Sequence, residues 1–70
     1  MSRRRAGRID KIIAAHVITY SDTGEKVGSI EWIKTNGDVG VTKGSLHSTH
    51  IDALFARARR EGVPIKRVTF

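Results

Sequence analysis

Apolar residues cluster in several stretches of this chain, and most of these stretches end at a turn signal. The first, residues 11–20 (KIIAAHVITY), is rich in β-branched side chains and precedes Ser21-Asp22-Thr23-Gly24. It predicts a strand; a helix is the competing interpretation, because two alanines would tolerate one. Both faces of such a strand are largely apolar, which favours a central position in a sheet. Strict alternation puts Ile12, Ala14, His16, Ile18 and Tyr20 on one face, and Ile13, Ala15, Val17 and Thr19 on the other.

Two further stretches predict a hairpin. In residues 27–34, Ile30 and Trp32 share one face, whereas the opposite face carries Val27, Ser29, Glu31 and Ile33. Residues 39–43 form the next strand, with Val39 and Val41 on one face and Gly40 and Thr42 on the other. Asn36-Gly37 lies between them and predicts a two-residue type I′ turn, because both central positions of that turn need positive φ.

A helix follows, since the apolar residues of the next stretch have the spacing i, i+3, i+4, i+7. Ser48 or Thr49 is the expected N-cap, with Asp52 completing a capping box that begins at Thr49. Gly62 suits the left-handed position after the helix, and Val63-Pro64 prevents continuation. Residues 65–70 form a last strand. The apolar stripe of the helix consists of Ile51, Leu54, Phe55 and Ala58.

The predicted fold is therefore α+β, in the order β-β-β-α-β: an antiparallel four-stranded sheet with one helix on one face. A single helix leaves the far face of the sheet partly in water, and a contiguous apolar patch there marks a protein interface, such as a homodimer. The alternative is a small cluster covered by long polar side chains and by the N-terminal segment. The predicted interface consists of Ile13, Val17, Val27 and Ile33. The predicted core consists of Ile18, Ile30, Trp32, Val39, Val41, Ile51, Leu54, Phe55, Ala58 and Phe70.

The length and composition of the chain restrict its class. Seventy residues make one domain, which we divide into a flexible basic arm, residues 1–10, and a single α+β domain, residues 11–70. With no cysteine there is no disulfide framework, so a cytoplasmic location is expected. The apolar run at residues 12–15 is too short to span a membrane.

The charge of the chain is concentrated at its start. The formal net charge is +6, and residues 1–11 carry five basic side chains against one acidic side chain. Guanidinium groups match phosphate oxygens, and counterion release drives such binding, so nucleic acid is an expected partner. A solvated segment that keeps a small protein soluble is the alternative.

Candidate catalytic and metal sites are weak. His47-x-x-His50, near Asp52, has a spacing that suits a metal, but a zinc site needs a third ligand; we expect no metal. The serines lack a Gly-x-Ser-x-Gly elbow, and the glycines lack a phosphate-loop pattern. We therefore expect no enzymatic activity and no cofactor.

Three stretches, MSRRRAGR, SDTGEKVG and STHIDALFARARREG, together resemble the arm-site DNA-binding domains of phage tyrosine integrases. This resemblance implies a sheet in the major groove and an arm in the minor groove. The chain departs from that pattern by its last strand and by Glu25, Glu31 and Asp38. The resemblance implies arm contacts by Arg3, Arg4, Arg5 and Arg8, and sheet contacts by Lys26, Lys34 and Lys43.

In size and style the chain also resembles small α+β proteins of phages and mobile elements, among them anti-CRISPR inhibitors. Two hypotheses follow. The first is a non-catalytic module that contacts nucleic acid, or an acidic nucleic-acid-handling surface, through the arm, the sheet and the helix-end residues Arg57 and Arg60. The alternative is an inhibitor directed at a host nucleic-acid-binding protein complex, which would use the open sheet face or the last strand.

Overall fold

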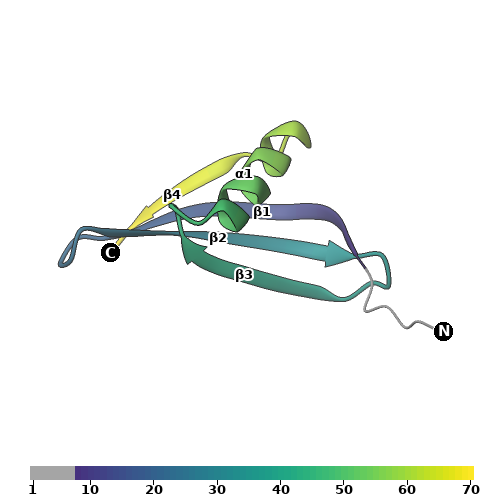
Figure 1. Cartoon of the computed structure of the whole chain (residues 1–70), viewed down its shortest axis with the longest axis horizontal. Coiled ribbons are helices and arrows are strands. Elements are labelled where there is room, and N and C mark those ends of the chain that lie inside the picture. The colour runs from purple at the N-terminus through teal and green to yellow at the C-terminus, as the bar shows by residue number, and fades with distance from the viewer. Residues whose placement is uncertain (1–7) are drawn as a thin grey trace.

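The computed structural model describes residues 8–70, in which one helix lies across one face of a four-stranded sheet (Figure 1). The α+β class is thereby confirmed. The first strand begins at Ile9, two residues before the predicted start of the domain. The elements, in chain order, are β1 (Ile9–Tyr20), β2 (Glu25–Lys34), β3 (Val39–Ser45), α1 (Thr49–Arg60) and β4 (Ile65–Thr69).

The sheet is mixed, so the prediction of a fully antiparallel sheet is wrong. The strand order is β3-β2-β1-β4, in which β2 runs antiparallel to both β1 and β3 while β4 runs parallel to β1. The reason is the connection through α1, which carries the chain from the β3 edge across the sheet to the opposite edge. A helical crossover of this length is the usual link between strands that run in the same direction.

Two irregularities in β1 change which side chains face the helix. The register against β2 shifts between Ile9 and Lys11 and again between Ile12 and Ala14. Each shift adds one residue to β1 and so breaks the strict alternation of its side chains. Ile12 consequently shares the helix side of the sheet with Ala15 and Val17, whereas Ala14, His16 and Ile18 lie on the opposite, open face. The predicted placement of Ile12 with Ile18, and of Val17 on the far face, is therefore wrong.

The core lies between α1 and the helix side of the sheet. The predicted core residues Ile30, Ile51, Leu54, Phe55 and Ala58 are buried there, and Trp32 packs against them. Ile12 and Ala15 complete the core, which the alternation pattern missed. Four predicted core residues lie elsewhere: Ile18 is half-buried on the open face, and the exposed side chains are Val39, Val41 and Phe70.

Trp32 explains why the valines of β3 are outside the core. Its ring lies over Gly40, where an added Cβ would come within 2.7 Å of Trp32 Cζ2. Trp32 Nε1 donates to Thr42 Oγ1 at 2.8 Å, and Lys34 Nζ lies 5.4 Å from the ring centroid. The ring thus covers the helix side of β3, and the valines that alternate with Gly40 and Thr42 face the other way.

The β2–β3 turn is longer than predicted. Asn36 does not have positive φ, whereas Gly37 has φ of 93°, so the type I′ prediction is wrong. The Gly37 N–H donates to the Lys34 carbonyl at 2.9 Å, and the Lys34 N–H donates to the Asp38 carbonyl at 2.8 Å. This is the three-residue loop in which a type I turn is followed by a left-handed glycine.

Both ends of α1 are capped. Ser48 is the N-cap, and its hydroxyl accepts from the Ile51 N–H at 3.5 Å, so Asp52 lies one position beyond the predicted capping box. At the other end Gly62 has φ of 78°. The Val63 N–H donates to the Ala58 carbonyl at 2.9 Å, which completes a Schellman motif and directs the chain into β4.

Candidate polyanion-binding groove

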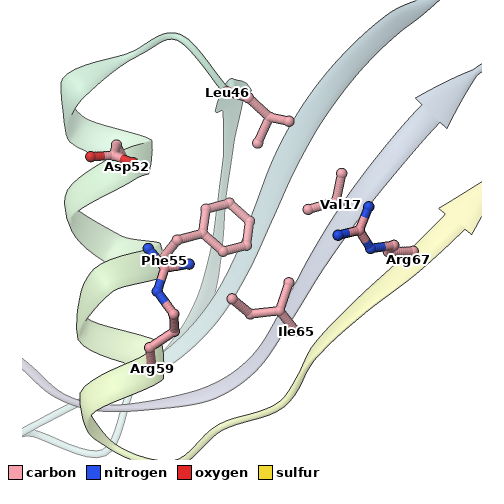
Figure 2. Close-up of a pocket in the computed structure, with 7 residues that line it drawn as sticks. All are labelled: Val17, Leu46, Asp52, Phe55, Arg59, Ile65 and Arg67. Atoms are coloured by element: carbon pink, nitrogen blue, oxygen red, sulfur yellow. The ribbon is translucent and has the colours of Figure 1, made fainter.

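A groove of about 350 Å³ lies on the helix side of the sheet, between α1 and β4 (Figure 2). The parallel pairing of β4 with β1 creates it, because Ile65 lies beside Ala15 and Arg67 lies beside Val17. The groove combines an apolar floor with charged side chains at its borders. Its lining consists of Val17, Leu46, Asp52, Phe55, Arg59, Ile65 and Arg67.

Two arginines give this groove its chemistry. Arg59 lies one helical turn after Phe55, and Arg67 lies two residues after Ile65, so both spacings bring a cation to the same surface as an apolar floor residue. Figure 2 shows Arg59 extending along the helix toward Phe55, and Arg67 beside Val17. Neither guanidinium makes an ion pair or a side-chain hydrogen bond within residues 8–70, and both residues are exposed. Their donors are therefore available to an anion.

Asp52 is the one acidic residue of the groove lining. It lies in the first turn of α1, where a carboxylate complements the helix dipole. Arg59 follows it by seven residues, about two turns along the same helix. The helix therefore contributes Asp52 toward one end of the groove and Arg59 toward the other.

The surroundings of the groove are basic. Residues 53–70, which form most of α1 and all of β4, carry five basic side chains and one acidic side chain. That acid, Glu61, is already paired with Arg57 at 2.7 Å. Residues 20–52 have the opposite balance, with three basic and five acidic side chains. Positive charge is thus gathered on the part of the molecule formed by α1 and β4, which we call the α1–β4 side.

Arg57, a predicted binding residue, lies outside the groove and contacts the start of β1. One of its terminal nitrogens donates to the Ile9 carbonyl at 3.0 Å and to the Asp10 carbonyl at 2.9 Å. Glu61 accepts from the Ile12 N–H at 2.8 Å. This hydrogen bond and the one from Arg57 lower the pKa of the Glu61 carboxyl. The pair therefore binds backbone groups that the irregular pairing of β1 leaves available.

The other predicted contact residues do not form one surface. Lys26 and Lys34 lie at opposite ends of β2, and Lys43 is on the open face, beside Ser29. Arg8 lies at the β2–β3 turn, where its carbonyl accepts from the Thr35 N–H. Arg60 is exposed at the end of α1. The predicted arm contacts Arg3, Arg4 and Arg5 lie outside the described residues.

The predicted interface residues are also divided. Val27 and Ile33 are half-buried on the open face, and Ile13 is exposed at the second irregularity of β1. Val17, in contrast, lines the groove. His47 and His50 are both exposed, and residues 8–70 contain no group of three or more side chains that could hold a metal ion.

Sequence reasoning missed Arg59 and Arg67. The spacings to Phe55 and Ile65 were present in the sequence, but they point to one site only when β4 lies parallel to β1 and beside the helix. An antiparallel β4 gave no reason to place these two arginines together.

Comparison with known protein families, with curated proteins and with solved structures finds no match to this chain. The one helix of the described part of the chain is too short and too polar to cross a membrane. The groove must therefore be interpreted from its own chemistry.

Proposed function

We propose that this protein is a non-catalytic binding module that contacts nucleic acid through its α1–β4 side. The observation that carries the proposal is the pair of unpartnered arginines, Arg59 and Arg67, beside an open apolar groove. Guanidinium groups bind phosphate oxygens in a bidentate manner, and the apolar floor accommodates the less polar parts of a sugar or base.

The charge distribution supports contact with a polyanion rather than with a single small anion. Arg60 lies next to Arg59 at the end of α1, and no acidic side chain occurs in β4. Several cations along one side match the regular spacing of backbone phosphates. The basic N-terminal segment adds further phosphate contacts in this proposal.

The test is fluorescence anisotropy with labelled duplex DNA, single-stranded DNA and RNA at several salt concentrations. We expect affinity to fall steeply between about 50 and 200 mM salt, because each phosphate contact releases counterions. In the Arg59→Gln/Arg67→Gln variant, we expect the slope of log affinity against log salt to decrease by about 2, with affinity at low salt reduced about tenfold or more.

The matched control is Lys34→Glu, which lowers the net charge by the same two units at the end of β2, outside the groove lining. Its salt slope should stay close to that of the unmodified protein. Equal losses in the two variants would show that net charge alone drives binding, and absence of binding at low salt would overturn the proposal.

A protein-directed inhibitor is the second candidate, and the observation that favours it is the position of β4. This strand pairs with β1 on one side only and forms an edge of the sheet. An edge strand offers backbone groups to a strand of a partner protein. This function would be favoured if the protein captured one host protein from a nuclease-treated lysate at any salt concentration. The capture should be lost in Arg67→Pro but kept in the Arg59→Gln/Arg67→Gln variant.

A further inference from the structure

The open face of the sheet carries several exposed apolar side chains. The exposed large hydrophobic residues belong to it or to its borders, and Val39, Val41 and Phe70 are 63%, 51% and 66% exposed. Phe70 is held in place, because its ring stacks on Tyr20 with centroids 5.8 Å apart and its N–H donates to the Thr19 carbonyl. A surface of this kind, ordered and apolar, is typical of an interface.

The strand register arranges the open face in rows that cross the sheet. We name each row by one of its residues. The Ile33 row is Val39, Ile33 and Lys11, and the Glu31 row is Val41, Glu31 and Ala14. The lysine row is Lys43, Ser29, His16 and Lys66, and the Ile18 row is Ser45, Val27, Ile18 and Val68. The rows follow one another along the strands in this order. The Ile33 row and the Ile18 row lie on the outside and are mainly apolar, and the Glu31 row and the lysine row lie between them.

We propose that the open face binds the open face of a second copy of this chain, about a two-fold axis that crosses the strands between the Glu31 row and the lysine row. This axis reverses the order of the rows in the partner. The Glu31 row then faces the partner's lysine row, and the Ile33 row faces the partner's Ile18 row. Two sheets packed face to face in this way lie about 10 Å apart, with their side chains interdigitated.

Charge complementarity favours a second copy as the occupant. Glu31 makes no ion pair within the described part of the chain, and neither do Lys43 and Lys66. In the proposed dimer each strand faces the same strand of the partner, so Glu31 lies opposite Ser29 of the partner subunit. The partner's Lys43 is one strand to the side, where its long side chain can reach Glu31, twice by symmetry. His16 lies opposite the small side chain of Ala14, which leaves room for the imidazole ring. A face with both signs of charge arranged in separate rows is complementary to itself.

The other in-plane two-fold axis, parallel to the strands, does not have this property. It would keep the order of the rows and place lysine row against lysine row, where like charges repel.

The test uses two charge-reversal variants, Glu31→Lys and Lys43→Glu, measured by sedimentation equilibrium over a range of concentrations. The unmodified chain is expected to have twice the monomer mass at high concentration, and each variant alone is expected to be monomeric. An equimolar mixture of the two variants should form a heterodimer, because each charge then meets the opposite charge in its partner. Circular dichroism of each variant verifies that it is folded.

The matched control is Asp22→Lys, which makes the same change of charge as Glu31→Lys in the β1–β2 turn and should remain dimeric. A chain that stays monomeric at millimolar concentration would overturn the proposal. So would a dimer that survives both reversals, or folded variants that do not associate when mixed. The groove lies on the opposite side of the sheet, so loss of the dimer and loss of nucleic-acid binding are separate outcomes.

Discussion

Arg57 and Glu61 show how two residues near the end of a helix stabilise an irregular strand. A β-bulge leaves backbone groups without a partner in the ladder, and such groups cost free energy when nothing else binds them. Arg57 donates to the Ile9 and Asp10 carbonyls, while Glu61 accepts from the Ile12 N–H. The 2.7 Å ion pair between the two side chains holds both in position. We infer that this pair fixes the end of α1 against the start of β1.

The lowered pKa of Glu61 gives a prediction for stability against pH. A carboxyl whose pKa is lower in the folded state stabilises the fold above its unfolded-state pKa of about 4.3, and this contribution is lost as pH falls through the lower, folded-state value. We expect Glu61→Gln to lower the thermal midpoint by about 5 °C at pH 7. This difference from the unmodified protein should shrink steadily below about pH 4.

Thermal unfolding followed by circular dichroism between pH 7 and pH 3 measures this difference. Glu25→Gln is the control, because Glu25 is exposed at the start of β2 and makes no ion pair within residues 8–70. A difference for Glu61→Gln that stays constant across this pH range would show that the ionised carboxylate is not what stabilises the contact.

The elements themselves were predictable from the sequence, whereas their relative arrangement was only partly so. Periodicity and caps identified the helix stripe at Ile51, Leu54, Phe55 and Ala58, because those signals are local. The extra residues in β1 carry no local signal, and each reverses the alternation that assigns side chains to a face. The direction of β4 likewise depends on how α1 crosses the sheet, and the groove at Arg59 and Arg67 follows from that direction.

Gly28 determines how closely α1 can approach the sheet. It lies on the helix side of β2, where an added Cβ would overlap the Phe55 ring and come within 2.6 Å of Ile51 Cγ2. Both neighbours are buried, so they have little freedom to move. We expect Gly28→Ala to destabilise the fold by about 1–3 kcal/mol, the usual cost of overpacking a core.

Urea unfolding of Gly28→Ala measures this cost. Gly44→Ala is a graded comparison, since its Cβ would lie 3.0 Å from Ile51 Cγ1 and should cost less. Equal stability of Gly28→Ala and the unmodified protein would mean that the helix can move away from the sheet without loss of packing.

At the scale of the whole molecule, positive charge is concentrated in two segments that are distant in sequence. Residues 1–11 and residues 53–70 each carry five basic side chains and one acidic side chain, while the acidic residues are concentrated between them. The fold brings the second segment to the first, because Arg57 contacts Ile9 and Asp10, and β4 lies beside β1. The proposed polyanion contact therefore joins the groove to the start of the chain.

This arrangement predicts that the two segments contribute independently to binding. In Arg3→Ala/Arg4→Ala/Arg5→Ala, the salt slope should fall by about 0.9 for each phosphate contact that is lost. Combining these changes with Arg59→Gln/Arg67→Gln should reduce the slope by the sum of the two separate effects, because each phosphate contact releases its own counterions. Anisotropy titrations with one duplex measure the salt slope of the unmodified protein, of each separate variant and of the combined variant. If the salt slope of the combined variant falls no further than that of Arg59→Gln/Arg67→Gln alone, the interface is restricted to the α1–β4 side. If Arg3→Ala/Arg4→Ala/Arg5→Ala alone abolishes binding, the interface lies at the start of the chain.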